Sequence, residues 1–191
     1  MSSLIIAGDT SGTITLDAPA VAGTTTLTLP TTNGTIITTG SSGQSIPKAA
    51  LPTGSILQVV SSTTTSGDSS TTSATFVDSG FSASITPTST SSKIFVIFNF
   101  NLQASSSGGQ AQSNVTLFRS STNIMNTNGN LLYNNTTSAN IHAPTTLTIV
   151  DSPNTTSSVT YSLRHRALTS TTSIITTGAG AVTITLMEIA A

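Results

Sequence analysis

Few side chains in this sequence have the chemistry for acid–base catalysis or metal binding. There are six carboxylic acids and two histidines. The acids, none of them close to another along the chain, are Asp9, Asp17, Asp68, Asp78, Asp151 and Glu188. Glycosidases place two carboxyl groups across a substrate cleft. Such clefts also hold sugars against aromatic rings, but this chain has no tryptophan and only two tyrosines. We therefore expect no catalytic residues and no enzymatic activity.

The two histidines, His142 and His165, lack the cysteines and the HxH or HExxH spacing that would complete a metal site. His165 falls on the apolar side of an alternating segment, so we expect it in a core or an interface. We expect His142 in a solvated loop. In a trimer, three copies of one histidine could meet on the axis. Within one chain we expect no metal and no cofactor.

The composition is poor in charge and rich in hydroxyl groups. Ser and Thr make up 72 of the 191 residues, whereas charged residues make up 6%, compared with roughly 25% in typical soluble domains. Five Lys and Arg residues cannot supply the basic surface that nucleic-acid binding needs. The sequence also contains no polybasic run and no apolar segment of membrane-spanning length. We expect neither nucleic-acid binding nor membrane insertion.

The residue types favour strands throughout the chain. Thr, Val and Ile are abundant, whereas the helix formers Lys, Glu and Arg are scarce. We expect an all-β fold with almost no helix. It would consist of an N-terminal arm of short β-repeats followed by an antiparallel β-sandwich or jelly-roll domain.

Residues 1–40 form the predicted arm, in which Gly12, Gly23 and Gly34 are spaced 11 residues apart. Each glycine opens a turn before a short alternating segment, and Asn33-Gly34 is a tight-turn signal. A repeat of this size cannot close a core alone. Its apolar side must therefore pack against sister chains or a neighbouring protein. The alternative is a low-complexity tail.

Residues 41–54 read as a linker, because Gly43, Pro47 and Pro52 favour irregular, extended backbone. Residues 55–191 read as one domain in which alternating segments recur between turn clusters, as in β-sandwiches and jelly rolls. The predicted strands span residues 56–60, 75–85, 93–103, 114–119, 141–151, 158–168, 173–177 and 181–189.

The segment from Lys93 to Leu102 carries the clearest pattern. One face is apolar throughout and should line the core. It consists of Ile94, Val96, Phe98, Phe100 and Leu102. The opposite face begins with Phe95 and Ile97 and then becomes polar, so its apolar half must be covered. We expect a second subunit there and assign Phe95 and Ile97 to a trimer interface. The alternative cover is a local loop.

The segment from Asn123 to Asn140 is rich in asparagine and contains Tyr133. Amides and an aromatic face suit glycan binding, because sugars present hydroxyls at the ring edge and CH groups on the ring face. We take Tyr133, Asn134 and Asn135 as candidate receptor contacts. The alternative is a plain loop, since asparagine is common in loops.

Two parts of the chain carry recognisable modules. The first comprises residues 11–16 (SGTITL), 23–30 (GTTTLTLP) and 33–35 (NGT). The second runs through residues 54–60 (GSILQVV), 76–87 (FVDSGFSASITP), 91–94, 117–119 (LFR) and 186–189 (LMEI). Together they resemble tail-fibre-like and other virion appendage proteins of marine bacteriophages, including phages of cyanobacteria and of abundant oceanic bacteria. The resemblance covers most of the chain, and its motifs are structural.

The resemblance implies a homotrimer assembled in the host bacterial cytoplasm and incorporated into the virion. Its arm, with Gly12, Gly23 and Gly34, would attach it to other phage head or tail proteins, and its domain would contact the host, with a cell-surface glycan as candidate receptor. One alternative is a capsid or tail decoration protein that only stabilises the particle. A bacterial surface adhesin ranks last, because Met1 to Thr10 do not read as an export signal.

Overall fold

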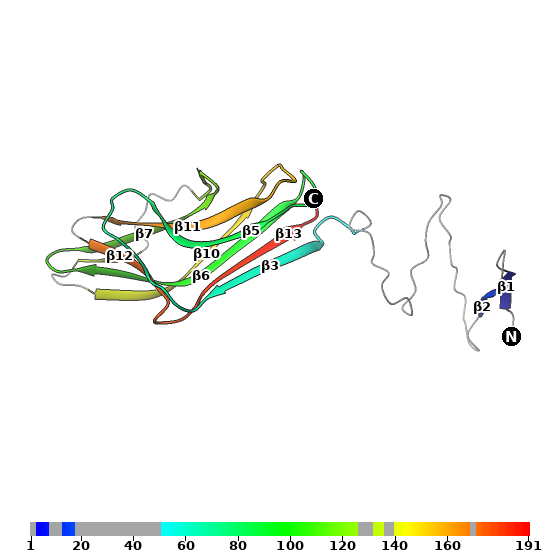
Figure 1. Ribbon diagram of the computed structural model, residues 1–191, viewed down its shortest axis with the longest axis horizontal. Coiled ribbons are helices and arrows are strands. Elements are labelled where there is room, and N and C mark those ends of the chain that lie inside the picture. Colours follow the sequence, from blue (N-terminus) through cyan, green and yellow to red (C-terminus); the bar gives the residue numbers. More distant parts are fainter. Residues whose placement is uncertain (1–2, 8–12, 18–50, 126–131, 136–139, 169–170) are drawn as a thin grey trace. The chain divides into compact units, whose positions relative to one another are not determined.

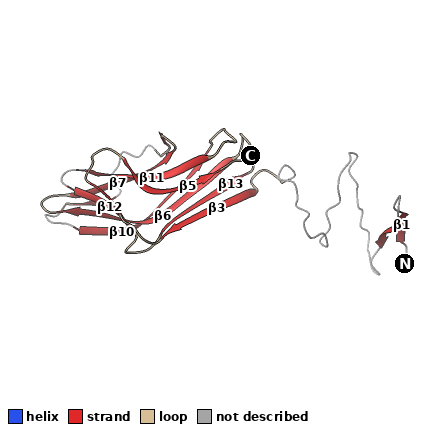
Figure 2. Cartoon of the chain, in the orientation of Figure 1, coloured by secondary structure: helices blue, strands red, loops and turns tan. Residues whose placement is uncertain are grey.

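The computed structural model describes residues 3–7, 13–17, 51–125, 132–135, 140–168 and 171–191. Every regular element among these residues is a β-strand (Figure 2), so the predicted all-β class is confirmed. None of the described residues forms a helix with the length and hydrophobicity of a membrane span. The chain divides into two compact units, Met1–Ser45 and Ile46–Ala191.

In the first unit, β1 (Ser3–Ala7) pairs antiparallel with β2 (Thr13–Asp17). The register pairs Ser3 with Asp17 at one end and Ala7 with Thr13 at the other. Gly12, Gly23 and Gly34 lie outside the described residues. The glycine repeat and the attachment role of the arm therefore stay predictions.

The second unit consists of two antiparallel sheets that form a β-sandwich (Figure 1). The six-stranded sheet contains β3 (Ile56–Thr64), β4 (Ser69–Thr71), β6 (Lys93–Ser106), β10 (Asn140–Asp151), β12 (Thr171–Thr176) and β13 (Val182–Ile189). The five-stranded sheet contains β5 (Val77–Ile85), β7 (Ala111–Arg119), β8 (Thr122–Asn123), β9 (Leu132–Asn134) and β11 (Val159–Leu168). The eight segments predicted from the sequence correspond to the eight longest of these strands. The short strands β4, β8 and β9 were not predicted.

Strand β6 is the centre of the six-stranded sheet. Strand β10 pairs along one edge of β6, and β12 and β13 follow one another along the other edge. Strands β4 and β3 continue the sheet beyond β12 and β13. In the other sheet the order is β5–β11–β7, and β8 and β9 share the free edge of β7. Each sheet is therefore four strands wide. Three of these eight strand positions are each shared by two strands: β3 and β4, β12 and β13, and β8 and β9.

The two ends of β6 define two ends of the sandwich. At the proximal end, Lys93 pairs with Ile189, and the start of the domain is held by a hydrogen bond from the Gly54 N–H to the Ala190 carbonyl at 2.7 Å. At the distal end, Ser106 pairs with Thr171, and the chain turns from β6 into β7.

The core lies between the sheets. The five apolar side chains predicted to face the core from β6 do so and are each at most 3% exposed: Ile94, Val96, Phe98, Phe100 and Leu102. Leu117 and Leu163 pack against them from the five-stranded sheet. Burial of one such side chain stabilises the fold by about 1.5–3 kcal/mol.

A charged group also joins the two sheets. Asp151 on β10 accepts hydrogen bonds from Arg119 Nη1 at 2.8 and 2.9 Å and from the Tyr161 hydroxyl at 2.7 Å. Burial raises the pKa of Tyr161 far above its ordinary value, and the hydrogen bond to Asp151 raises it further. The hydroxyl therefore stays protonated and serves as a donor.

A second carboxylate, Glu188 on β13, fixes the proximal end. It is fully buried and accepts hydrogen bonds from Gln58 Nε2 (2.6 Å), the Thr88 N–H (2.6 Å) and hydroxyl (2.7 Å), and the Ser92 hydroxyl (2.7 Å). Burial alone raises the pKa of Glu188, but these hydrogen bonds outweigh it and hold the pKa below its ordinary value. The ionised carboxylate thus ties β3 and the β5–β6 connection to β13.

We predict that Glu188→Gln destabilises the protein by about 2–4 kcal/mol, because the amide NH₂ must face one of the surrounding donors. Urea unfolding followed by circular dichroism at pH 7 measures the change. Thr185→Ala, on the opposite face of the same strand, is the control, and we expect it to cost no more than about 1 kcal/mol. Equal costs for the two variants would contradict the role of Glu188.

Candidate functional site

The predicted interface residues Phe95 and Ile97 lie on the outer face of the six-stranded sheet, the face turned away from the other sheet. Both are half-buried. Phe95 pairs with Val150 on β10 and with Met187 on β13, and Met187 pairs in turn with Val59 on β3. One row of apolar residues therefore crosses all four strand positions of the sheet.

Further apolar residues on this face extend the row. We call the set the apolar strip: Ile56, Val59, Phe95, Ile97, Val150, Met187 and Ile189. Among the described residues, four large apolar side chains are strongly exposed, and three of them belong to the strip: Ile56 (55%), Val59 (56%) and Val150 (53%). An exposed apolar patch of this kind is typical of an interaction surface.

The outer face turns polar toward the distal end. The row two residues beyond Ile97 contains Asn99, flanked by Thr146 on β10 and Thr183 on β13. Thr146 donates a hydrogen bond to Asn99 Oδ1 at 2.7 Å, and Asn99 Nδ2 donates to Thr183 Oγ1 at 3.3 Å. The outward residues of β6 beyond this row are Asn101, Gln103 and Ser105, and the apolar residues beside them are Pro144 on β10 and Ile174 on β12. The apolar strip is therefore confined to the proximal half of the sheet.

The candidate receptor residues lie at the distal end. The sequence predicts a loop from Asn123 to Asn140, but the structure places strand β9 inside it, and Tyr133 pairs with Gln112 at the start of β7. Tyr133 is 48% exposed, Asn134 is half-buried and Asn135 is exposed. The prediction that Tyr133 and Asn134 lie in a loop is therefore wrong, and their role as receptor contacts stays a prediction.

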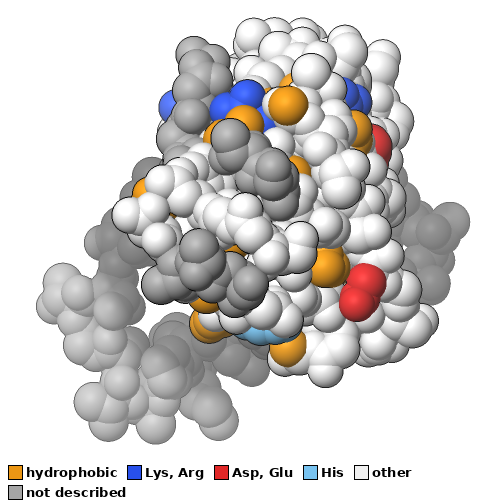
Figure 3. All heavy atoms as spheres, turned by 90° about the vertical axis from the view of Figure 1, so that its left-hand side faces the viewer, with side chains coloured by type: hydrophobic (Ala, Val, Ile, Leu, Met, Phe, Trp, Pro, Cys, Tyr) orange, Lys and Arg blue, Asp and Glu red, His pale blue; other side chains and the backbone are white. Residues whose placement is uncertain are grey.

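Two glutamines that the sequence reasoning missed join these residues. Gln110 Nε2 donates to Asn135 Oδ1 at 2.7 Å, and Gln112 Nε2 donates to Gln110 Oε1 at 2.9 Å. An amide chain therefore runs beside the exposed ring of Tyr133. From this end of the molecule, the side chains that are not grey are mostly uncharged (Figure 3). Such a surface offers hydrogen bonds and a ring face with little charge.

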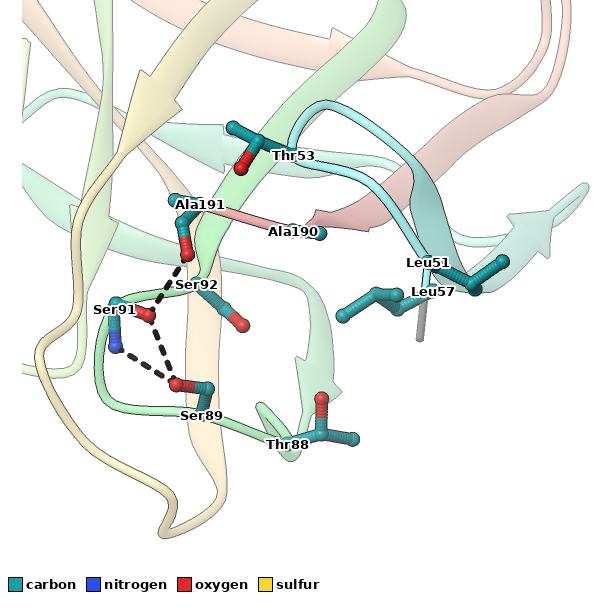
Figure 4. Close-up of a pocket in the computed structure, with 9 residues that line it drawn as sticks. All are labelled: Leu51, Thr53, Leu57, Thr88, Ser89, Ser91, Ser92, Ala190 and Ala191. Atoms are coloured by element: carbon teal, nitrogen blue, oxygen red, sulfur yellow. Dashed lines mark hydrogen bonds between the residues drawn. The ribbon is translucent and has the colours of Figure 1, made fainter. Parts of the chain in front are cut away.

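A pocket of about 520 Å³ opens at the proximal end (Figure 4). Its apolar lining consists of Leu51, Leu57, Ala190 and Ala191, and hydroxyl side chains form the rest. Several of these hydroxyls are already engaged: Thr88 and Ser92 donate to Glu188, as described above. The residues that line the pocket include no charged or imidazole side chain, so they offer no obvious acid, base or nucleophile pair.

His165 and three serines form a polar network between the sheets. His165 Nδ1 lies 3.0 Å from Ser173 Oγ and its Nε2 lies 3.2 Å from Ser69 Oγ, while Ser173 also bonds to Ser113. His165, Ser113 and Ser173 are fully buried, so a substrate cannot reach them in this conformation. The network joins β11 and β7 to β12 and β4. The sequence predicts that His165 lies in a core or an interface, and the structure places it in the core.

The two histidines do not come together. His142 is exposed, as predicted, but it lies on the outer face of β10 rather than in a loop. Because His165 is buried with both ring nitrogens bonded, it cannot point to a symmetry axis between subunits. In the described part of the chain, no three His, Asp or Glu side chains gather where they could hold a metal.

Comparison with known proteins assigns this chain to no family. No protein-family model matches the chain, and no curated protein shows significant sequence similarity to it.

Burial lowers the pKa of His165 from 6.5 to about 4. Between these values the unfolded chain binds a proton that the folded protein does not, so stability falls as the pH is lowered through this window. We predict a loss of roughly 2–3 kcal/mol between pH 7 and pH 4.5. In His165→Gln this pH dependence should largely disappear. Urea unfolding at several pH values tests the prediction, and equal pH slopes for the two proteins would contradict it.

Proposed function

We propose that this chain is a structural virion protein, the subunit of a short homotrimeric bacteriophage fibre or appendage. The arm fixes the trimer to other head or tail proteins of the particle, and the distal end of the sandwich faces the host cell. The observation that carries the proposal is the apolar strip around Phe95 and Ile97. A domain with so few charges that still exposes apolar residues across four strands needs a partner surface.

The strand order supports a jelly roll. Counting β3/β4, β8/β9 and β12/β13 as single positions gives eight positions along the chain. The sheets then read 1-8-3-6 and 2-7-4-5, which is the order of a jelly roll, a fold used by viral capsid and lectin domains. This support is an analogy of fold, because one fold serves many functions. The resemblance to phage appendage proteins points in the same direction.

The arm carries the attachment role in this proposal. We predict that deletion of residues 1–40 leaves the sandwich folded. Its hydrophobic core and the hydrogen bonds of Asp151, Glu188 and His165 all lie within residues 46–191. The truncated protein should fail to enter phage particles. Circular dichroism reports folding, and quantitative protein analysis of purified particles reports incorporation. Particles that contain the truncated protein at normal stoichiometry would contradict the attachment role.

The distal surface carries the receptor role, with a cell-surface glycan as the ligand class. We predict that Tyr133→Ala combined with Asn135→Ala slows adsorption of phage to cells at least several-fold. Each weak contact acts three times per trimer, so avidity amplifies its loss. Stability should change by only about 0.5 kcal/mol, since both side chains are exposed.

The matched control is Thr156→Ala, an exposed hydroxyl in the β10–β11 connection at the proximal end. It should leave adsorption unchanged. If the double variant folds, assembles and adsorbs at the wild-type rate, the distal surface is not the receptor site. The protein would then fit a decoration role.

A further inference from the structure

The apolar strip stops halfway along the sheet, and this boundary has a consequence for assembly. We propose that the strip is the contact between copies of this chain, and that the copies touch only along the proximal half of the six-stranded sheet. The distal halves then stand apart, with their mostly polar outer faces hydrated. This inference rests on the proposed homotrimer and adds which surface joins the sandwiches and where the contact ends.

The position of the strip identifies a second copy as its occupant. Ile56 and Val59 lie just after Leu51–Gly54, where the chain enters the domain, and Ile189 lies beside the same point. Arms that associate therefore bring the proximal ends of the sandwiches together. The strip itself contains no charged residue, and only Lys93 borders it on β6. Identical copies can therefore bring their apolar side chains together, provided that the Lys93 side chains stay at the solvated edge of the contact.

The strip is too small to give a stable contact by itself. Stable protein interfaces usually bury about 800 Å² per partner through roughly 20–30 residues. Seven side chains fall short of that, so the strip alone cannot hold copies together. The arm supplies the remaining affinity by raising the effective concentration of one strip near another. The contact is therefore expected in the full-length chain.

The polar rows limit the contact. Asn99, Thr146 and Thr183 bond to one another and also face water, and Thr63 completes the row on β3. Burying these groups against an identical polar row would remove water from amides and hydroxyls without new partners of matching geometry, which is unfavourable. In the preceding row Ile97 is the one apolar residue, beside Thr148, Thr185 and Ser61. The interface should therefore thin out around Ile97 and end before the Asn99 row.

The absence of cysteine from the chain allows a direct test. Single cysteines at Val59→Cys and Val150→Cys probe the strip, and Thr63→Cys and Thr146→Cys probe the polar row on the same two strands and the same face. All four native side chains are exposed in the single chain. The measurement is the rate of maleimide labelling of each full-length variant, relative to its rate in denaturant, together with its mass by light scattering.

We expect the cysteines at 59 and 150 to react at least about tenfold more slowly than those at 63 and 146, in a protein of multimeric mass. Equal labelling in a multimer would overturn this inference but leave the proposed homotrimer standing. Protection at a single-chain mass would mean that the chain's own arm covers the strip, which also overturns it. Equal labelling at a single-chain mass would overturn both the inference and the homotrimer.

Discussion

The alternation of side chains along β6 is the constraint on which the domain depends. Its inner face supplies the centre of the core, and each of its edges is paired over most of its length, by β10 on one side and by β12 and β13 on the other. Because side chains alternate between faces, the inner face cannot shift register without moving apolar residues into water. The outer face is thereby fixed as well, and with it the position of Phe95 and Ile97.

The two ends of the sandwich differ in chemistry. The proximal end combines the apolar strip, the buried carboxylate of Glu188 and the point where the chain enters the domain. The distal end combines amides, hydroxyls and the exposed ring of Tyr133. A surface that must associate permanently benefits from apolar contacts, whereas a surface that must bind and release a polar ligand benefits from exposed hydrogen-bonding groups. The division fits an appendage held at one end and free at the other.

Much of the fold could be predicted from the sequence, because it follows from local alternation. The pattern from Lys93 to Leu102 predicts both faces of β6, and the alternation around His165 predicts its buried position. The short strand β9 could not be predicted, since it depends on pairing with β7 and has no alternating run of its own. The hydrogen bonds of Glu188 could not be predicted either, because its donor Thr88 lies 100 residues earlier in the chain. The sequence also isolates Phe95 and Ile97, whereas Val59, Val150 and Met187 join them only through cross-strand register.

The account depends most on the association of three copies of the chain. The most direct test is the mass of the full-length protein in solution, measured by light scattering at micromolar concentration. The chain has a mass of 19.3 kDa, and the account predicts a single species of three times that mass. A species of 19.3 kDa that persists across the concentration range would contradict it.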